Sequence, residues 1–223
     1  MLWWCPNHVA FSLLIEWETK ASRGKESRAK GIGTLKSHLL DCHTEMPSVF
    51  CVFREVRMDA LEAIKGRRSI RKYKPTAVPE EKLTQILEAG RWAPSASNSQ
   101  PWKFIVVRNE KVRNELARVA TYGSFLAQAP VAIAVVIDPR ASNHPVEDGA
   151  AAAQNMLLAA HALGLGTCWI GSYDSAYEGR AKEVLGIPDD KRLQSLIALG
   201  YAAESPTKGR VELSKLVCYD RYA

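Results

Sequence analysis

Paired cysteines, long hydrophobic runs and a dense basic stretch are all lacking in this sequence. The 5 cysteines among 223 residues include no Cys-x-x-Cys spacing, which argues against a disulfide-stapled secreted domain. The 14 glycines and 11 prolines are near average usage, so collagen-like and low-complexity chains are excluded. What is present, 47% hydrophobic and 24% charged residues, is the composition of a soluble globular protein with one sizeable core.

Several catalytic and metal-binding motifs are absent as well. There is no His-Glu-x-x-His, no Gly-x-Ser-x-Gly and no Gly-x-x-x-x-Gly-Lys phosphate loop, so metalloprotease, serine hydrolase and P-loop chemistry lack their usual signals. The cysteines and histidines between Cys5 and His43 match no common zinc-finger spacing. We therefore expect no metal site.

The charge balance is mildly basic, with 30 Lys+Arg against 24 Asp+Glu and a formal net charge of +6. This surplus fits an anionic small ligand or an acidic partner. A nucleic-acid-binding protein more often shows a dense basic stripe with interleaved aromatic residues. We therefore expect a small-molecule ligand and no nucleic-acid partner.

The first fifteen residues carry no formally charged side chain, which suggests a signal peptide or a membrane anchor. The details argue against both, because there is no basic segment at the start, Pro6 interrupts the apolar run and Glu16 follows it. A helix that crosses a bilayer also needs about 20 residues. Together with the scattered cysteines, this predicts a reduced, cytoplasmic, soluble protein without a membrane partner.

The sequence changes character near Met58. Residues 1–57 show no sustained helical or strand period, and we read them either as an overlong gene model or as a genuine extension that is poorly packed. From Met58 onward the pattern becomes regular. We predict helices at 59–65, 79–92, 109–119, 145–163 and 176–185, and strands at 104–107, 131–137, 167–170 and 193–199. Alternating helices and strands of this kind indicate a layered α+β or α/β domain over residues 58–223.

Two polar clusters after Met58 are candidates for ligand binding. The run Arg-Arg-Ser-Ile-Arg at 67–71 offers three guanidinium groups, which bind phosphate oxygens through paired hydrogen bonds; otherwise it is a solvated basic loop. Residues 93–102 contain short hydroxyl and amide side chains between two prolines. Such a loop is suited to the edge of a flat heteroaromatic ligand, although many clusters of this kind are plain turns.

Two further clusters follow. Glycines at 164–171 permit close approach of the backbone to a ligand, or they end a helix before a strand. Within that segment we expect Cys168 to be a small buried side chain rather than a nucleophile. Lys208 and Arg210 could close over the same anion as the first cluster.

Taken together and in this order, the four clusters resemble the motifs of the FMN-dependent nitroreductase family, over about residues 58–223. The resemblance implies an α+β fold: a three-layer α-β-α sandwich with a mostly antiparallel sheet, assembled as an intertwined homodimer with FMN at the subunit interface. Relative to longer members, loops that shape the acceptor pocket are expected to be absent.

The resemblance also implies a set of FMN contacts. Pro94, Ser95 and Ala96 would come from one subunit's loop, and Gly171 would offer a backbone N–H near flavin N5. The cofactor-binding residues implied are Arg67, Arg68, Ser69, Arg71, Pro94, Ser95, Ala96, Asn98, Gln100, Ile170, Gly171, Lys208 and Arg210. No side chain is implied as a catalytic acid or base.

The activity implied is a two-step transfer at one site, in which NADH or NADPH reduces FMN and a nitroaromatic, quinone or similar electrophile then takes the electrons. Two alternatives keep the flavin: other flavin chemistry, such as reductive dehalogenation or flavin fragmentation, or a flavin-binding module without turnover.

Overall fold

The structure is a computed structural model that describes residues 58–222. The chain divides into two compact units, Met1–Arg54 and Glu55–Ala223, and the description below concerns the second unit alone. The predicted extension at 1–57 lies outside the described residues, and so does the group of cysteines and histidines within it.

The described residues form five α-helices, four strands and three short 3-10 turns. The helices are α2 (Ala60–Gly66), α3 (Glu80–Arg91), α4 (Glu110–Val119), α5 (Pro145–Ala162) and α6 (Glu178–Leu185). The strands are β1 (Trp102–Val107), β2 (Val131–Ile137), β3 (Gly166–Gly171) and β4 (Arg192–Gly200). The turns are η2 (Ala96–Asn98), η3 (Ser124–Ala127) and η4 (Leu213–Lys215).

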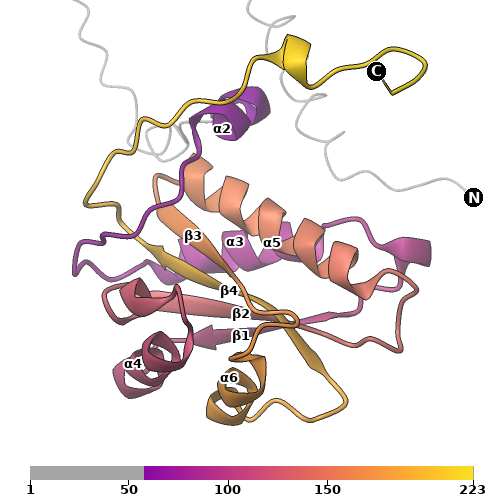
Figure 1. The fold of residues 1–223 in the computed structure, drawn as a ribbon. Coiled ribbons are helices and arrows are strands. Elements are labelled where there is room, and N and C mark those ends of the chain that lie inside the picture. Colours follow the sequence, from indigo (N-terminus) through magenta and orange to yellow (C-terminus); the bar gives the residue numbers. More distant parts are fainter. Residues whose placement is uncertain (1–57, 223) are drawn as a thin grey trace, which may run out of the picture. The chain divides into compact units, whose positions relative to one another are not determined.

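All four strands pair antiparallel in the order β1-β2-β4-β3, so β1 and β3 are the edges of the sheet. Helices α3 and α5 cover one face, and α4 and α6 cover the other (Figure 1). This is the three-layer α-β-α sandwich with an antiparallel sheet that the motifs imply.

Strand β2 shows why its sequence is apolar throughout. Ile133 packs with α3 and α5, whereas its neighbours Ala132 and Ala134 pack on the opposite face. Alternating side chains of a strand point to opposite faces, so a central strand with helices on both sides must be apolar at every position. All seven residues of β2 are buried accordingly.

The predicted helix ends are set by local chemistry. The Asn109 side chain accepts hydrogen bonds from two backbone N–H groups at the start of α4, Pro145 begins α5, and Gly186 ends α6 with φ of +64°. The small residues of α5 let it pack against α3 and all four strands, so the prediction of a central buried helix is confirmed.

The observed bounds differ from the predicted ones by one or two residues. Strand β1 begins at Trp102 instead of residue 104, because Trp102 pairs with Ile137 across the ladder. Helix α6 begins at Glu178 instead of residue 176. Within the described part of the chain, no helix has both the length and the hydropathy needed to span a membrane.

Candidate functional site

The first predicted cluster runs along the open edge of β3. Ile70 donates its N–H to the carbonyl of Thr167 at 2.9 Å, and Ser69 forms a parallel bridge with the same residue. Gly166 permits this close approach, because a Cβ atom there would lie 2.8 Å from Cγ1 of Ile70. The cationic segment is therefore held against the strand by its own backbone and by a buried isoleucine.

Arg67, Ser69 and Arg71 alternate along this extended segment, and all three act on the Cys168 thiol of β3. Burial raises the pKa of that thiol and outweighs the two arginine charges and the Ser69 hydrogen bond, which lower it. Cys168 is therefore a neutral, buried side chain at neutral pH, as predicted.

The cations of the first and fourth clusters are close enough to repel one another. Burial, followed by the charges of Arg210 and Arg68, lowers the pKa of the Arg67 guanidinium. Within residues 58–222, no carboxylate forms an ion pair with Arg67, Arg68, Arg71, Lys208 or Arg210. A bound anion would relieve this repulsion, so the electrostatics of the β3 edge are suited to an anion.

A cavity of about 370 Å³ opens beside these arginines. Arg67, Arg68, His161, Thr167 and Glu204 are among the residues that line it. Two buried polar atoms there, Nε of Arg68 and Oγ1 of Thr167, have no hydrogen-bond partner among the described residues. Buried donors are rarely left unsatisfied, and a phosphate group would supply acceptors for both.

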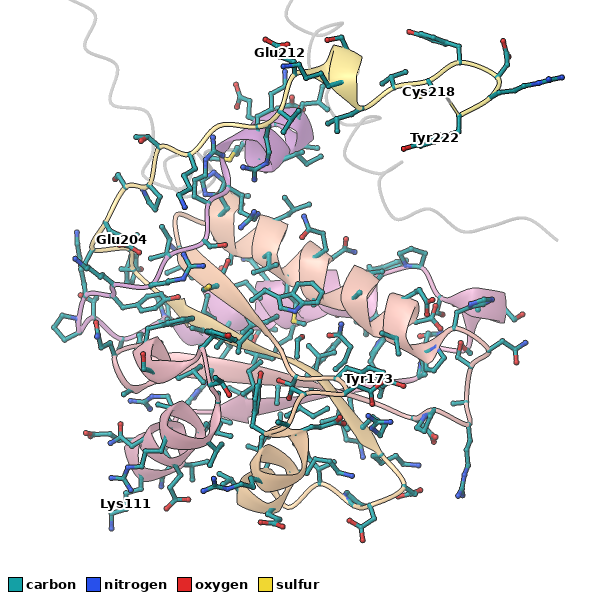
Figure 2. All side chains as sticks on the ribbon, in the orientation of Figure 1. Lys111, Tyr173, Glu204, Glu212, Cys218 and Tyr222 are labelled. Carbon is teal, nitrogen blue, oxygen red and sulfur yellow. The ribbon has the colours of Figure 1, made fainter. Side chains whose placement is uncertain are left out.

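Glu204 is the one carboxylate in that cavity lining, and backbone groups already engage it. Its Oε1 accepts the N–H groups of Arg71 and Lys72 at 2.5 and 3.2 Å. This ties the start of the C-terminal arm, residues 203–222, to the cationic segment. Beyond Glu204 the arm leaves the sheet and runs out to Tyr222 (Figure 2).

A second cavity, of about 620 Å³, lies further along β3. Arg71, Phe125, Ile170 and Gly171 are among its lining residues, and the Arg71 guanidinium lies 5.9 Å from the centre of the Phe125 ring. Tyr122 also borders this cavity and is 84% exposed. Aromatic side chains, one cation and a glycine at the strand end are suited to an aromatic ring system.

The second predicted cluster forms a strained loop between α3 and β1. Ser97, Asn98 and Gln100 have φ values of +53°, +55° and +48°, in the left-handed region that non-glycine residues rarely adopt. Oδ1 of Asp148 accepts the N–H of Ala96 at 2.9 Å and helps to hold the loop. Backbone strain that the surroundings maintain is concentrated at functional sites.

This loop lies diagonally across the sheet from the cationic segment. It precedes Trp102, which pairs with Ile137 at one end of β2, whereas Thr167 is aligned through Leu199 with Val131 at the other end. Those ends are about 20 Å apart, and the edge strands β1 and β3 are about 14 Å apart. One chain therefore does not bring the two halves of the predicted site together.

The predicted site residues thus fall into three groups. Arg67, Arg68, Ser69, Arg71, Ile170 and Gly171 lie along the β3 edge, with Arg210 acting on Arg67. Lys208 is exposed on the C-terminal arm, two residues from Arg210. Pro94, Ser95, Ala96, Asn98 and Gln100 belong to the distant loop.

Sequence reasoning missed three residues that the structure places at the site. Asp148 lies in the first turn of α5, where it is buried and anchors the loop. Its burial left no mark on the local pattern. Thr167 and His161 had no signal beyond their place near the glycine cluster. Among the described residues, no group of three or more His, Cys, Asp or Glu side chains is placed to hold a metal ion.

A sandwich of this topology with a cationic sheet edge is the fold of the nitroreductases. An FMN-dependent nitroreductase from Clostridium difficile superimposes with a TM-score of 0.68 at 34% identity, covering 73% of this chain and 99% of that one. An NADPH:FMN oxidoreductase from Vibrio harveyi, solved with NAD+, has a TM-score of 0.68 at 27% identity, covering 74% of this chain and 78% of that one.

The Nitroreductase family model matches residues 64–122 and 117–201, and this chain belongs to that family. A protein of Methanothermobacter thermautotrophicus, named as a candidate NADH dehydrogenase/NAD(P)H nitroreductase, is 46% identical over 155 residues, which are 67% of this chain and 81% of that protein. The family resemblance read from the four clusters is therefore confirmed, and the chain is a nitroreductase-like enzyme.

Proposed function

We propose that this protein is an FMN-dependent NAD(P)H oxidoreductase. The observation that carries the proposal is the cationic edge of β3. Its arginines form no ion pair with a carboxylate of residues 58–222, and the cavity beside them holds two buried polar atoms without a hydrogen-bond partner in that part of the chain. Relatives named for FMN and for NAD(P)H support the same cofactors here.

The residues at this edge fit FMN. Arg67, Ser69, Lys208 and Arg210 would hold the phosphate, and Thr167 adds a hydroxyl that the sequence did not suggest. Bound FMN would supply the redox chemistry, by taking two electrons from NAD(P)H and passing them to the acceptor.

The chain itself binds, orients and tunes. Arg71 lines the second cavity together with Phe125, and its charge would stabilise the negative charge of the reduced flavin ring. Because the Cys168 thiol is protonated, it does not form an ion pair with the Arg71 guanidinium. Ile170 and Gly171 line the same cavity, and Gly171 adds no side chain to it.

We further propose that the enzyme is a homodimer, with each FMN bound between subunits. The loop with Pro94, Ser95, Ala96, Asn98 and Gln100 cannot reach the cationic segment of its own chain. A second copy can present that loop to the β3 edge of the first. Exposed apolar side chains on the C-terminal arm, among them Leu213 and Leu216, are consistent with burial against a second copy.

The acceptor we propose is a small electrophile, such as a nitroaromatic or a quinone. The aromatic side chains that line the second cavity, with the exposed Tyr122 at its border, favour an aromatic acceptor over an extended polymer.

Anaerobic mixing of the FMN-loaded protein with NADH or NADPH tests the proposal. Bleaching of the flavin absorbance, reversed by a nitroaromatic or a quinone, is the expected result. A protein that takes up no FMN contradicts the proposal as a whole. Bound FMN that neither nucleotide bleaches would instead indicate a binding module, and product analysis with halogenated acceptors separates dehalogenation from nitro reduction.

A further inference from the structure

Tyr177 contacts the strand end that lies on the proposed flavin cavity, although it lies outside all four sequence clusters. It immediately precedes α6 and is 7% exposed. Its hydroxyl donates to the carbonyl of Gly171 at 2.5 Å and lies 3.1 Å from Oγ of Ser172. With the tyrosine hydrogen used on Gly171, the Ser172 hydroxyl can donate to the tyrosine oxygen or to the Ile170 carbonyl, which lies 3.4 Å from Oγ, so both hydroxyls are satisfied.

The peptide that joins Gly171 to Ser172 is therefore held at both of its polar atoms. Its carbonyl accepts from Tyr177, and its N–H donates to the carbonyl of Gln194 on β4 at 3.2 Å. Gly171 has no side chain to restrict it, and a Cβ atom there would meet nothing nearer than 4.0 Å. These two hydrogen bonds hold the peptide on the C-terminal side of Gly171, and the pairing of Ile170 with Leu196 holds the peptide on its N-terminal side.

The register of the ladder gives the direction of the remaining Gly171 donor. Hydrogen-bonded and non-hydrogen-bonded pairs alternate in an antiparallel ladder. Because Ser172 bonds to Gln194, the preceding residue turns its N–H away from β4. Strand β3 is the edge of the sheet, so this N–H is directed toward the open side where Gly171 lines the second cavity.

The loop that carries Tyr177 is itself strongly anchored. The Glu178 carboxylate accepts hydrogen bonds from Arg192 at 2.7 and 2.8 Å and from the N–H groups of Asp174 and Leu193. Burial would raise the pKa of Glu178, but the Arg192 and backbone hydrogen bonds outweigh it and lower the pKa. The anchor thus stays ionised in mildly acidic solution, and Tyr177 has little freedom to move.

We propose that Tyr177 is a positioning residue that tunes the reduction potential of the flavin through Gly171; this rests on the proposed function. Flavin N5 accepts a hydrogen bond when oxidised and carries a hydrogen itself when reduced. A fixed N–H that faced N5 would therefore stabilise the oxidised state selectively and lower the midpoint potential. Tyr177 acts by restraining Gly171, the residue that carries this N–H.

The test compares Tyr177→Phe, which removes only the hydroxyl, with Tyr173→Phe. Tyr173 lies just beyond β3 (Figure 2), and its ring packs on Arg192 at 4.3 Å. Its hydroxyl makes no hydrogen bond within residues 58–222, so its loss should leave the flavin unchanged. The measurements are the midpoint potential of bound FMN, the Kd of oxidised FMN, and amide exchange at Ser172 in the flavin-free protein.

In Tyr177→Phe, faster exchange at Ser172 and a positive shift of the midpoint potential are expected. A change of about tenfold in the ratio of the oxidised and reduced Kd values corresponds to about 30 mV. Ser172→Ala keeps the bond to Gly171 but removes the neighbouring hydroxyl, so it should shift the potential in the same direction by less. This second variant provides the test if Tyr177→Phe does not fold.

An FMN-loaded Tyr177→Phe protein with the wild-type potential overturns this inference and leaves the proposed function intact. An equal shift in Tyr173→Phe overturns it as well, because the effect would then come from the loop in general. A wild-type protein that binds no FMN overturns the proposed function and this inference together. Loss of stability without a change in potential would show that Tyr177 is structural only.

Discussion

Individual side chains at the β3 edge combine charge with incomplete hydrogen bonding. Burial and the charges of Arg210 and Arg68 lower the pKa of Arg67, and Thr167 keeps a buried hydroxyl without a hydrogen-bond partner among residues 58–222. Arrangements of this kind cost stability in the absence of a ligand and gain from anion binding. Single substitutions at this edge should therefore change FMN binding and the pH dependence of stability.

Replacement of Arg67 by alanine should weaken FMN binding by about 1.5–3 kcal/mol, the range for hydrogen bonds to charged groups. Fluorescence titration of the flavin-free protein measures this. Arg180→Ala removes an exposed arginine of α6, on the opposite layer, and should leave the Kd unchanged. Equal effects of the two variants would show that only net charge matters.

His161 should make the flavin-free protein less stable in mild acid. Burial, then the charges of Arg67 and Arg68, lowers the pKa of this histidine in the folded protein. The unfolded chain therefore binds more protons near and below pH 6.5, so stability falls as the pH falls through that range. Thermal unfolding between pH 8 and 5 measures the slope.

His161→Gln, which does not titrate, should reduce this loss of stability, and His144→Gln, an exposed histidine at the start of α5, serves as the control. Saturating inorganic phosphate should reduce the loss in the wild type, because the bound anion favours protonated His161. An identical pH profile for wild type and His161→Gln would contradict the prediction.

At the scale of elements, α5 supports the strained loop and the cationic segment, which the proposed dimer assigns to two different sites. Its first turn carries Asp148, whose Oδ1 accepts the N–H of Ala96 and whose Oδ2 accepts the hydroxyl of Ser142 at 2.5 Å. Its last turn carries His161 beside the cationic segment. The helix thus supports the strained loop at one end and the anion site at the other.

Asp148→Ala should lower the free energy of unfolding by about 1–3 kcal/mol, because it leaves the Ala96 N–H without its acceptor. Urea unfolding measures this. Glu147→Ala changes the exposed neighbour in the same turn and should cost well under 1 kcal/mol. A similar cost for both variants would indicate a helix-dipole effect, and not the anchor.

At the scale of the whole molecule, the function we propose requires two copies to complete each site. We therefore expect the purified protein to have the mass of a dimer, and the doubly substituted Leu213→Asp/Leu216→Asp protein to lose dimer and FMN together. Light scattering on a sizing column, with flavin absorbance, reports both. Lys215→Glu lies on the same short turn and should keep both. A monomer that retains FMN would contradict the split site.

The sequence by itself determined the helices and strands and the clusters of candidate binding residues. Local chemistry sets the apolar run of β2, the Asn109 cap and the order of the arginine, serine and glycine clusters. Such features can be predicted from neighbouring residues in the sequence. Only the tertiary structure decided which clusters meet. Strand order and register separate the 94–100 loop from Arg67, because they arise from pairing between residues distant in sequence, which no local pattern records. The turn between β3 and α6 brings the Tyr177 hydroxyl back to the Gly171 carbonyl, a contact that the sequence pattern did not indicate.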